Sequence, residues 1–181
     1  MLAERPDAVV HGAHAVNAYA ATERMTQDID VLCTQAANLA EAVRARLAER
    51  FHLAVRVREV VPATGYRVYQ LRDAGNRHLV DVRGVAELPG HVDIGGVSVV
   101  ELPELMVMKS RALAARRNRE KGLSDRLDLH RLLNAHPELR EPDGVVARRL
   151  AAPADKAALE AWREVVAERV EPDAEEDEFG G

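Results

Sequence analysis

Two aspartates near position 30 are the residues of this chain best suited to chemistry. Asp28 and Asp30 stand at the entrance of an apolar run that ends at Cys33. In a β-strand, residues i and i+2 point to the same face, so the two carboxylates would project side by side from a rigid support. Carboxylate oxygens suit hard divalent cations and the phosphates that accompany them. Because such a pair costs burial energy beside a core strand, it indicates a site for a metal ion and a phosphate.

A metal site for a triphosphate needs more than two protein ligands, and two further aspartates are candidates for the third. Asp81 interrupts the apolar strand expected at 79–83, where a carboxylate carries a burial cost. Asp93 lies beside the glycine pair Gly95-Gly96, where an acid is common in a turn. The burial argument favours Asp81, and Asp93 remains the alternative.

A glycine turn precedes the aspartate pair. Gly12 follows the short apolar run Val9–His11 and comes before Ala13 and the alanine-rich stretch 13–21, which predicts a strand, a turn and a helix. Glycine lets the backbone approach a ligand closely, and the free N–H groups at a helix N-terminus can bind phosphate. The sequence therefore predicts a phosphate-binding turn that faces the carboxylates.

Lys109 is the most informative cation, because it lies on the apolar face of a helix expected to start at Leu102. Its ammonium group either extends to solvent or pairs with Asp81, Asp128 or a bound phosphate, and we expect an active-site partner. Arg116 is a further candidate for stabilising phosphate charge. Asp125 and Asp128 follow Ser124, a predicted N-cap, so a first-turn role beside the helix dipole is expected for both.

Apolar periodicity arranges these residues on an α/β (α+β) fold: a mixed β-sheet flanked by helices, with further helices at the C-terminus. Strands are expected at 28–33, 54–61, 66–72, 79–83 and 97–100, and the last two are expected to form a hairpin. Helices are expected at 36–50, from 102, from 124 and at 154–170. The predicted organisation is a core at 1–101, a helical region packed on it at 102–170, and a disordered acidic tail at 171–181.

Composition narrows the class of protein. The chain has 181 residues, 47% of them apolar, and a net charge of −5, which argues against a general nucleic-acid coat. A single cysteine, Cys33, excludes an internal disulfide and fits a cytoplasmic protein, and no segment has the length of a membrane span. The basic stretch from Lys109 to Arg131 is the candidate surface for an RNA acceptor.

Taken in order, these motifs resemble the nucleotidyltransferase superfamily. The specific part is Arg24-x-Thr26-x-Asp28-Ile29-Asp30, which lies between the Gly12 turn and Asp81. Later residues resemble the bacterial branch related to the nucleotidyltransferase toxins of abortive-infection systems. These later residues are Leu102-Pro103-Glu104-Leu105, Lys109, Arg116-Arg117, Lys121, Asp125 and Asp128-Leu129.

The resemblance implies a nucleotidyltransferase-like sheet in which Asp28, Asp30 and Asp81 hold Mg²⁺ and catalyse transfer of an NMP from an NTP. It further implies that the turn at Gly12 and Ala13 contacts the triphosphate. The acceptor hydroxyl would belong to a tRNA, a protein or a small molecule, and a toxin–antitoxin setting implies a partner encoded in the same operon. Ala13 stands where the family usually has Ser or Gly, so an inactive binding or antitoxin-like module with this fold is the alternative.

Overall fold

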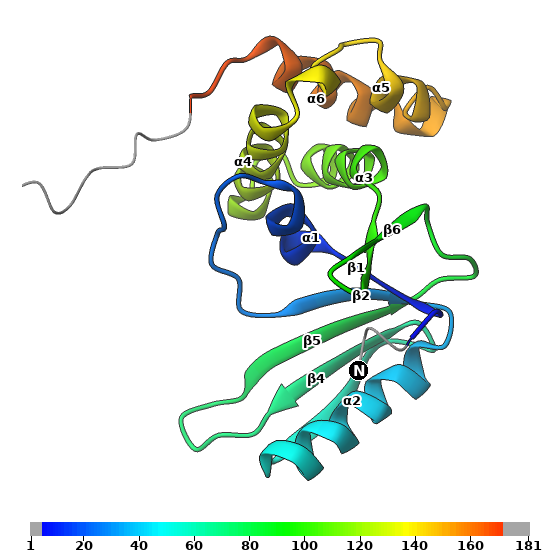
Figure 1. Cartoon of the computed structure of the whole chain (residues 1–181), viewed down its shortest axis with the longest axis vertical. Helices are drawn as coiled ribbons and strands as arrows, with labels where there is room; N and C mark the ends of the chain where they lie inside the picture. Colours follow the sequence, from blue (N-terminus) through cyan, green and yellow to red (C-terminus); the bar gives the residue numbers. More distant parts are fainter. Residues whose placement is uncertain (1–4, 172–181) are drawn as a thin grey trace, which may run out of the picture. The chain divides into compact units, whose positions relative to one another are not determined.

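The computed structural model describes residues 5–171 and divides into two compact units, Met1–Leu105 and Met106–Gly181 (Figure 1). The first unit contains a mixed β-sheet and the second is helical. The described helices include none that is long and apolar enough to cross a membrane. Of the predicted acidic tail at 171–181, all but Glu171 lies outside the described residues.

The sheet of the first unit has seven strands in the order β3-β4-β5-β2-β1-β7-β6. The pairs β2–β5 and β1–β7 are parallel, and the other neighbouring strands are antiparallel. This confirms the mixed sheet that the sequence predicts. The strands are β1 (Ala8–His11), β2 (Ile29–Cys33), β3 (Val55–Val61), β4 (Gly65–Gln70), β5 (Arg77–Gly84), β6 (His91–Ile94) and β7 (Val97–Val100).

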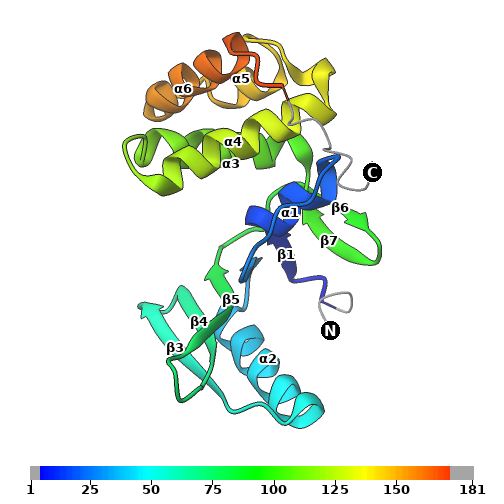
Figure 2. The same cartoon turned by 90° about the vertical axis from the view of Figure 1, so that its left-hand side faces the viewer.

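Two helices accompany the sheet, α1 (Gly12–Tyr19) and α2 (Ala36–Phe51). Helix α2 lies along one face of β3, β4 and β5 (Figure 2). Its residues Leu39, Ala40 and Val43 form a buried cluster with strand residues that alternate along the chain, as expected for a half-buried sheet. Cys33 of β2 belongs to this cluster, and burial raises the pKa of its thiol.

One predicted strand pairing is wrong. The glycine pair does form a hairpin turn, but the turn joins β7 to β6 (His91–Ile94), and β5 pairs with β2 and β4 instead. Strand β6 has only four residues, three of them exposed, so it lacks the apolar alternation by which a strand is recognised in a sequence. The carboxylate of Asp93 accepts a hydrogen bond from the Gly96 N–H within this turn.

Helix α3 (Leu102–Ala115) starts in the last residues of the first unit, and most of it belongs to the second unit. The second unit also contains α4 (Glu120–Ala135), α5 (Val145–Arg149) and α6 (Lys156–Ala167). Helices α4 and α6 pack on each other. Leu129, Leu132 and Leu133 of α4 and Trp162 and Val165 of α6 are fully buried.

Helix α4 begins one turn earlier than the Ser124 start that the sequence predicts. Its N-cap is Arg119, and the Ser124 hydroxyl donates to the Glu120 carbonyl inside the helix. Gly122 explains the error, because a glycine near a helix start resembles a turn residue. A Cβ at this position would overlap the carbonyl of Arg116, so the glycine allows the helix to pass close to the preceding backbone.

Candidate active site

The aspartate pair lies where β2 begins, beside the turn into α1. Asp30 is the register partner of His11, the last residue of β1, and Gly12 follows directly with a positive φ of 68°. A Cβ at position 12 would overlap the carboxylate of Asp30. Only glycine combines this backbone conformation with this contact, so the Gly12 turn and the Asp30 carboxylate form one continuous surface.

Asp81 is brought beside Asp30 by the parallel pairing of β2 and β5. The two residues are direct register partners, and neighbouring strands lie about 4.8 Å apart. Their side chains therefore point to the same face of the sheet. Asp28 lies in the segment just before β2, and its carboxylate contacts His78 of β5. The structure thus places Asp30 and Asp81 side by side on adjacent strands, with Asp28 just before β2. Asp93 lies in β6, opposite Ser98 of β7.

A β-bulge in β5 adds a histidine to this face. Val68 of β4 pairs with Val80, but the next residue, Tyr69, pairs with His78, so Leu79 is the extra residue. The bulge reverses the alternation, and His78 lies on the face of Asp81 although three positions separate them. Its Nδ1 lies 3.0 Å from Oδ2 of Asp28, and its ring packs against that of Tyr69 with 5.3 Å between centroids.

Arg67 of β4 supplies a cation to the same face. It is the register partner of Asp81 and donates from Nε to Oδ2 of that carboxylate over 3.0 Å. The side chains are 42% and 27% exposed, so the pair is open to solvent. Hydrogen bonding to Tyr69 and then to Asp81 raises the pKa of Arg67. Two of the three carboxylates therefore each have a neighbouring basic side chain.

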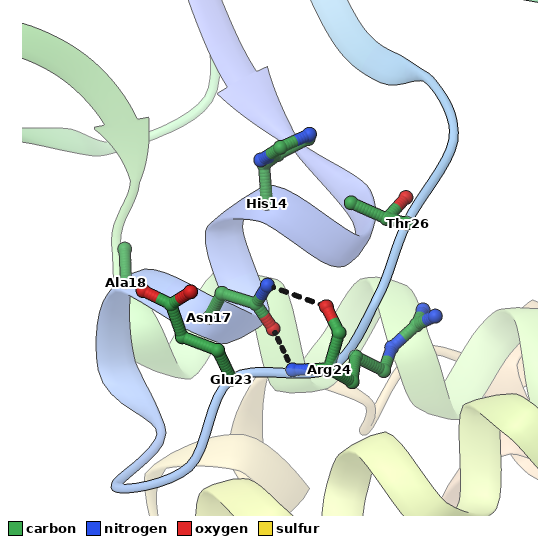
Figure 3. Close-up of a pocket in the computed structure, with 6 residues that line it drawn as sticks. All are labelled: His14, Asn17, Ala18, Glu23, Arg24 and Thr26. Carbon is green, nitrogen blue, oxygen red and sulfur yellow. Dashed lines mark hydrogen bonds between the residues drawn. The ribbon is translucent and has the colours of Figure 1, made fainter.

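A pocket of about 420 Å³ lies between α1 and the segment that leads into β2 (Figure 3). The side chain of Asn17 holds this segment in place: its Nδ2 donates to the Arg24 carbonyl over 2.9 Å, and its Oδ1 accepts from the Arg24 N–H over 3.1 Å. Thr26 donates to the carbonyl of Asp28. The motif from Arg24 to Asp30 is thereby fastened to α1. The pocket is lined by His14, Asn17, Ala18, Glu23, Arg24 and Thr26.

The carboxylates match the donor chemistry that Mg²⁺ requires. Among residues 5–171, no three His, Cys, Asp or Glu side chains are grouped so as to hold a metal ion by themselves. Mg²⁺ usually binds through one or two carboxylates and completes its shell with water and substrate phosphate. The adjacent Asp30 and Asp81, with the Gly12 turn packed against Asp30, fit that mode of binding.

Lys109 pairs with Asp128, one of the alternatives, and not with the expected active-site partner. In the second unit its Nζ donates to Asp128 over 2.6 Å and to Asp125 over 3.2 Å, and Arg116 donates to Asp125 over 2.7 Å. The first-turn role expected for the two aspartates is wrong, because both are buried inside α4. Binding of a nucleotide by Lys109 or Arg116 stays a prediction.

Sequence reasoning missed three residues of the site: Asn17, Arg67 and His78. A polar Asn inside an alanine-rich helix is a weak signal for Asn17. Arg67 can be connected to Asp81 only through the register of β4 and β5. The bulge hides His78, because the regular alternation of a strand would place it on the opposite face.

Comparison with known proteins gives one family and several structural relatives. Residues 2–179 match the family model described as nucleotidyl transferase AbiEii toxin, type IV TA system. No curated protein matches the chain. The crystal structure of JHP933 from Helicobacter pylori aligns with a TM-score of 0.53 and 17% identity, over 91% of this chain and 84% of that one.

Two further solved structures align with similar quality. A putative nucleotidyltransferase from H. pylori gives a TM-score of 0.53 and 16% identity over 91% of this chain and 86% of that one. The Megavirus polyadenylate synthase gives a TM-score of 0.57 and 15% identity over 75% of this chain but only 29% of that one. These likenesses establish a nucleotidyltransferase-like fold.

Proposed function

Because the chain belongs to the AbiEii nucleotidyl transferase toxin family, we propose that it is a Mg²⁺-dependent enzyme that transfers an NMP from an NTP to a hydroxyl acceptor. The observation that carries this proposal is the register of the sheet. Asp30 and Asp81 are partners on adjacent parallel strands, and the backbone turn at Gly12 lies directly against Asp30. An ordinary sheet core gains nothing from two neighbouring carboxylates at this place.

The residues divide the work as follows. Asp30 and Asp81 would hold Mg²⁺, and Asp28 would join them after release from His78. Bound Mg²⁺ supplies neutralisation of phosphate charge and activation of the acceptor hydroxyl. The N–H groups at the start of α1, from Gly12 and Ala13 onward, would bind the triphosphate oxygens. Arg67 would orient the Asp81 carboxylate through its hydrogen bond.

The pocket beside α1 supports the same proposal. One of its lining residues, Thr26, lies two residues before Asp28 and bonds to the carbonyl of Asp28. The volume of the pocket is in the range of small-molecule sites. The side chains of His14, Glu23 and Arg24 offer hydrogen-bonding groups there (Figure 3). We assign this pocket to the nucleoside part of the NTP.

The first test is calorimetric titration of each NTP with Mg²⁺ into the whole protein. We expect the double variant Asp28→Asn/Asp30→Asn to lose Mg·NTP binding and to keep its melting temperature. Asp93→Asn is the matched control, since Asn can still accept the hydrogen bond from Gly96 and the substitution lies away from the site. Equal Mg·NTP affinity in the double variant and the control would overturn the proposal.

A non-catalytic binding module is the second candidate, and the carboxylate partners favour it. Asp28 and Asp81 already face His78 and Arg67, and Ala13 provides no hydroxyl for phosphate. Such a module would bind the product of a neighbouring gene and release no pyrophosphate. Pyrophosphate release by the isolated protein with any acceptor would exclude it.

A further inference from the structure

The basic stretch that the sequence offers as an RNA surface is largely neutralised within the second unit. Six of its cations form ion pairs with carboxylates of that unit. Within the described part of the chain, only Arg119 and Lys121 of this stretch form no ion pair. The paired cations are Lys109, Arg111, Arg116, Arg117, Arg126 and Arg131. A polyanion would therefore have to displace internal carboxylates to bind there.

Helix α2 covers one face of β3, β4 and β5 (Figure 2). A different set of arginines lies on the opposite face of these strands. Register places them there: Arg56 pairs with Tyr69, Arg58 with Arg67, and Gly65 with Arg83. Direct partners on neighbouring strands point to the same face, and residues i and i+2 do so within a strand. Arg56, Arg58, Arg67 and Arg83 thus share one surface, the arginine face.

The opposite face confirms this orientation. Val55, Val57 and Val68, which alternate with the arginines, pack into the cluster beneath α2. Leu79 and Val80 also pack against that cluster, as the bulge requires. The arginine side chains therefore point away from the α2 cluster, and those at 56, 58 and 83 are exposed.

The arginine face carries more positive charge than its own carboxylates balance. Arg67 has Asp81, but Arg56, Arg58 and Arg83 form no ion pair with any described residue. Arg58 stands directly opposite Arg67, and like charges at such positions destabilise a sheet. A chain with a net charge of −5 nevertheless keeps these arginines on one surface. The arrangement is favourable when a polyanion lies across it.

The arginine face is continuous with the candidate active site on the same sheet surface. Arg58, Arg67, Asp81 and Asp30 are register partners in a row across four neighbouring strands, each step about 4.8 Å. Tyr69 lies between the arginines of β3 and His78, and aromatic rings next to cations are how proteins hold single-stranded bases and phosphates together.

From this row we infer that the arginine face binds the phosphodiester backbone of a single-stranded nucleic acid whose end supplies the acceptor hydroxyl. The inference rests on the proposed function for the role of that hydroxyl, but the binding of the strand does not depend on catalysis. Charge complementarity and the interleaved Tyr69 favour a nucleic acid over a protein acceptor.

The experiment measures binding of a fluorescent 12-nucleotide single-stranded RNA of mixed sequence by anisotropy, in EDTA and at several salt concentrations. We compare the whole protein with Arg56→Gln/Arg58→Gln. Arg44→Gln/Arg46→Gln is the control for net charge, since it removes two arginines, paired with Glu41 and Glu49, from α2 on the other side of the same strands. Arg46, Arg56 and Arg58 are exposed and Arg44 is half-buried. Surface sites of this kind tolerate substitution, and the melting temperature of each variant is recorded.

We expect the β3 variant to bind more weakly and its salt slope, log K against log [salt], to be less steep by about 1.4, because each lost phosphate contact contributes about 0.7 for a single strand. The α2 control should match the unmodified protein. Equal slopes for the two variants would overturn the inference. Equally tight binding of poly-glutamate, lost in the β3 variant, would overturn it in favour of an acidic protein.

The outcome separates this inference from the proposed function. RNA binding lost in Arg56→Gln/Arg58→Gln, without pyrophosphate release from any NTP, would support the surface and refute the enzyme. NMP transfer to a protein or a small molecule, unchanged in Arg56→Gln/Arg58→Gln, would support the enzyme and refute the surface.

Discussion

Cations are used in opposite ways in the two units. In the second unit, Lys109 is buried between Asp125 and Asp128, and Arg116 shares Asp125 with it. In the first unit, Arg56 and Arg58 stand on an edge strand with no carboxylate partner among residues 5–171. A buried charge must be matched internally, whereas an exposed charge costs little and remains available to a ligand.

This contrast shows why abundance of positive charge along a sequence is a poor guide to a binding surface. The stretch from Lys109 to Arg131 is rich in basic residues, yet helix packing gives most of them acidic partners. Arg56 and Arg58 of β3 are separated by Val57 in the sequence, and only strand alternation and register place them on one surface with Arg67.

The largest effect on stability is expected at Lys109, where the comparison predicts that the cation is needed inside the second unit. Lys109→Met leaves the buried Asp128 without its closest cation, which should destabilise the second unit by about 3–5 kcal/mol. Fluorescence of Trp162, the one tryptophan of the chain, follows unfolding of this unit in denaturant.

Two variants control this experiment. Lys121→Met, an exposed position with no ion pair in the described part of α4, should leave stability nearly unchanged. Lys109→Met/Asp128→Leu should recover much of the loss, since it removes the stranded charge. A Lys109→Met protein as stable as the Lys121→Met control would show that the lysine is not part of the structural network.

The partner of Lys109 is a feature that the sequence alone could not predict. From its place on the apolar face of a helix we expect an active-site partner, and that expectation is wrong, because Lys109 pairs with Asp125 and Asp128. The choice between Asp81 and Asp128 depends on how α3 and α4 pack, which the periodicity of each helix alone cannot specify. The strands around Asp28, Asp30 and Asp81 were predictable because alternation and burial cost act locally.

The bulge in β5 was not predictable in the same way. It depends on a mismatch between Val68–Tyr69 and His78–Val80 that exists only once the two strands are paired. The His78 contact with Asp28 follows from the bulge. The row of polar partners across β2, β5, β4 and β3 follows from the strand register alone.

A smaller effect is expected from pH, which should change the stability of the second unit through His130. His130 is buried in α4, and burial lowers its pKa; Glu168 opposes the shift, and the charges of Arg140 and Arg126 add to it. The unfolded chain then takes up a proton more readily than the folded protein, so stability is lost as the pH falls below the ordinary value of 6.5.

The measurement is denaturant unfolding of Trp162 between about pH 8 and pH 5.5, a window around the ordinary pKa of histidine. His130→Gln keeps a hydrogen-bond donor toward Glu168 but does not titrate. We expect the stability of the unmodified protein to fall more steeply on acidification than that of the variant. Parallel pH profiles would show that His130 is not responsible.

The smallest expected effect is a gain of stability on the arginine face. Arg58→Thr removes a like charge directly opposite Arg67 and introduces a residue that suits strands, so β3–β5 should become more stable by about 0.2–1 kcal/mol. Amide hydrogen exchange of these strands provides the measurement.

Arg56→Thr is the matched control, because its partner is Tyr69 rather than a cation. The gain should shrink at high salt, where the repulsion is screened, and should be accompanied by weaker RNA binding. Loss of stability in Arg58→Thr would mean that this arginine has a structural role after all, and that the two units use their cations alike.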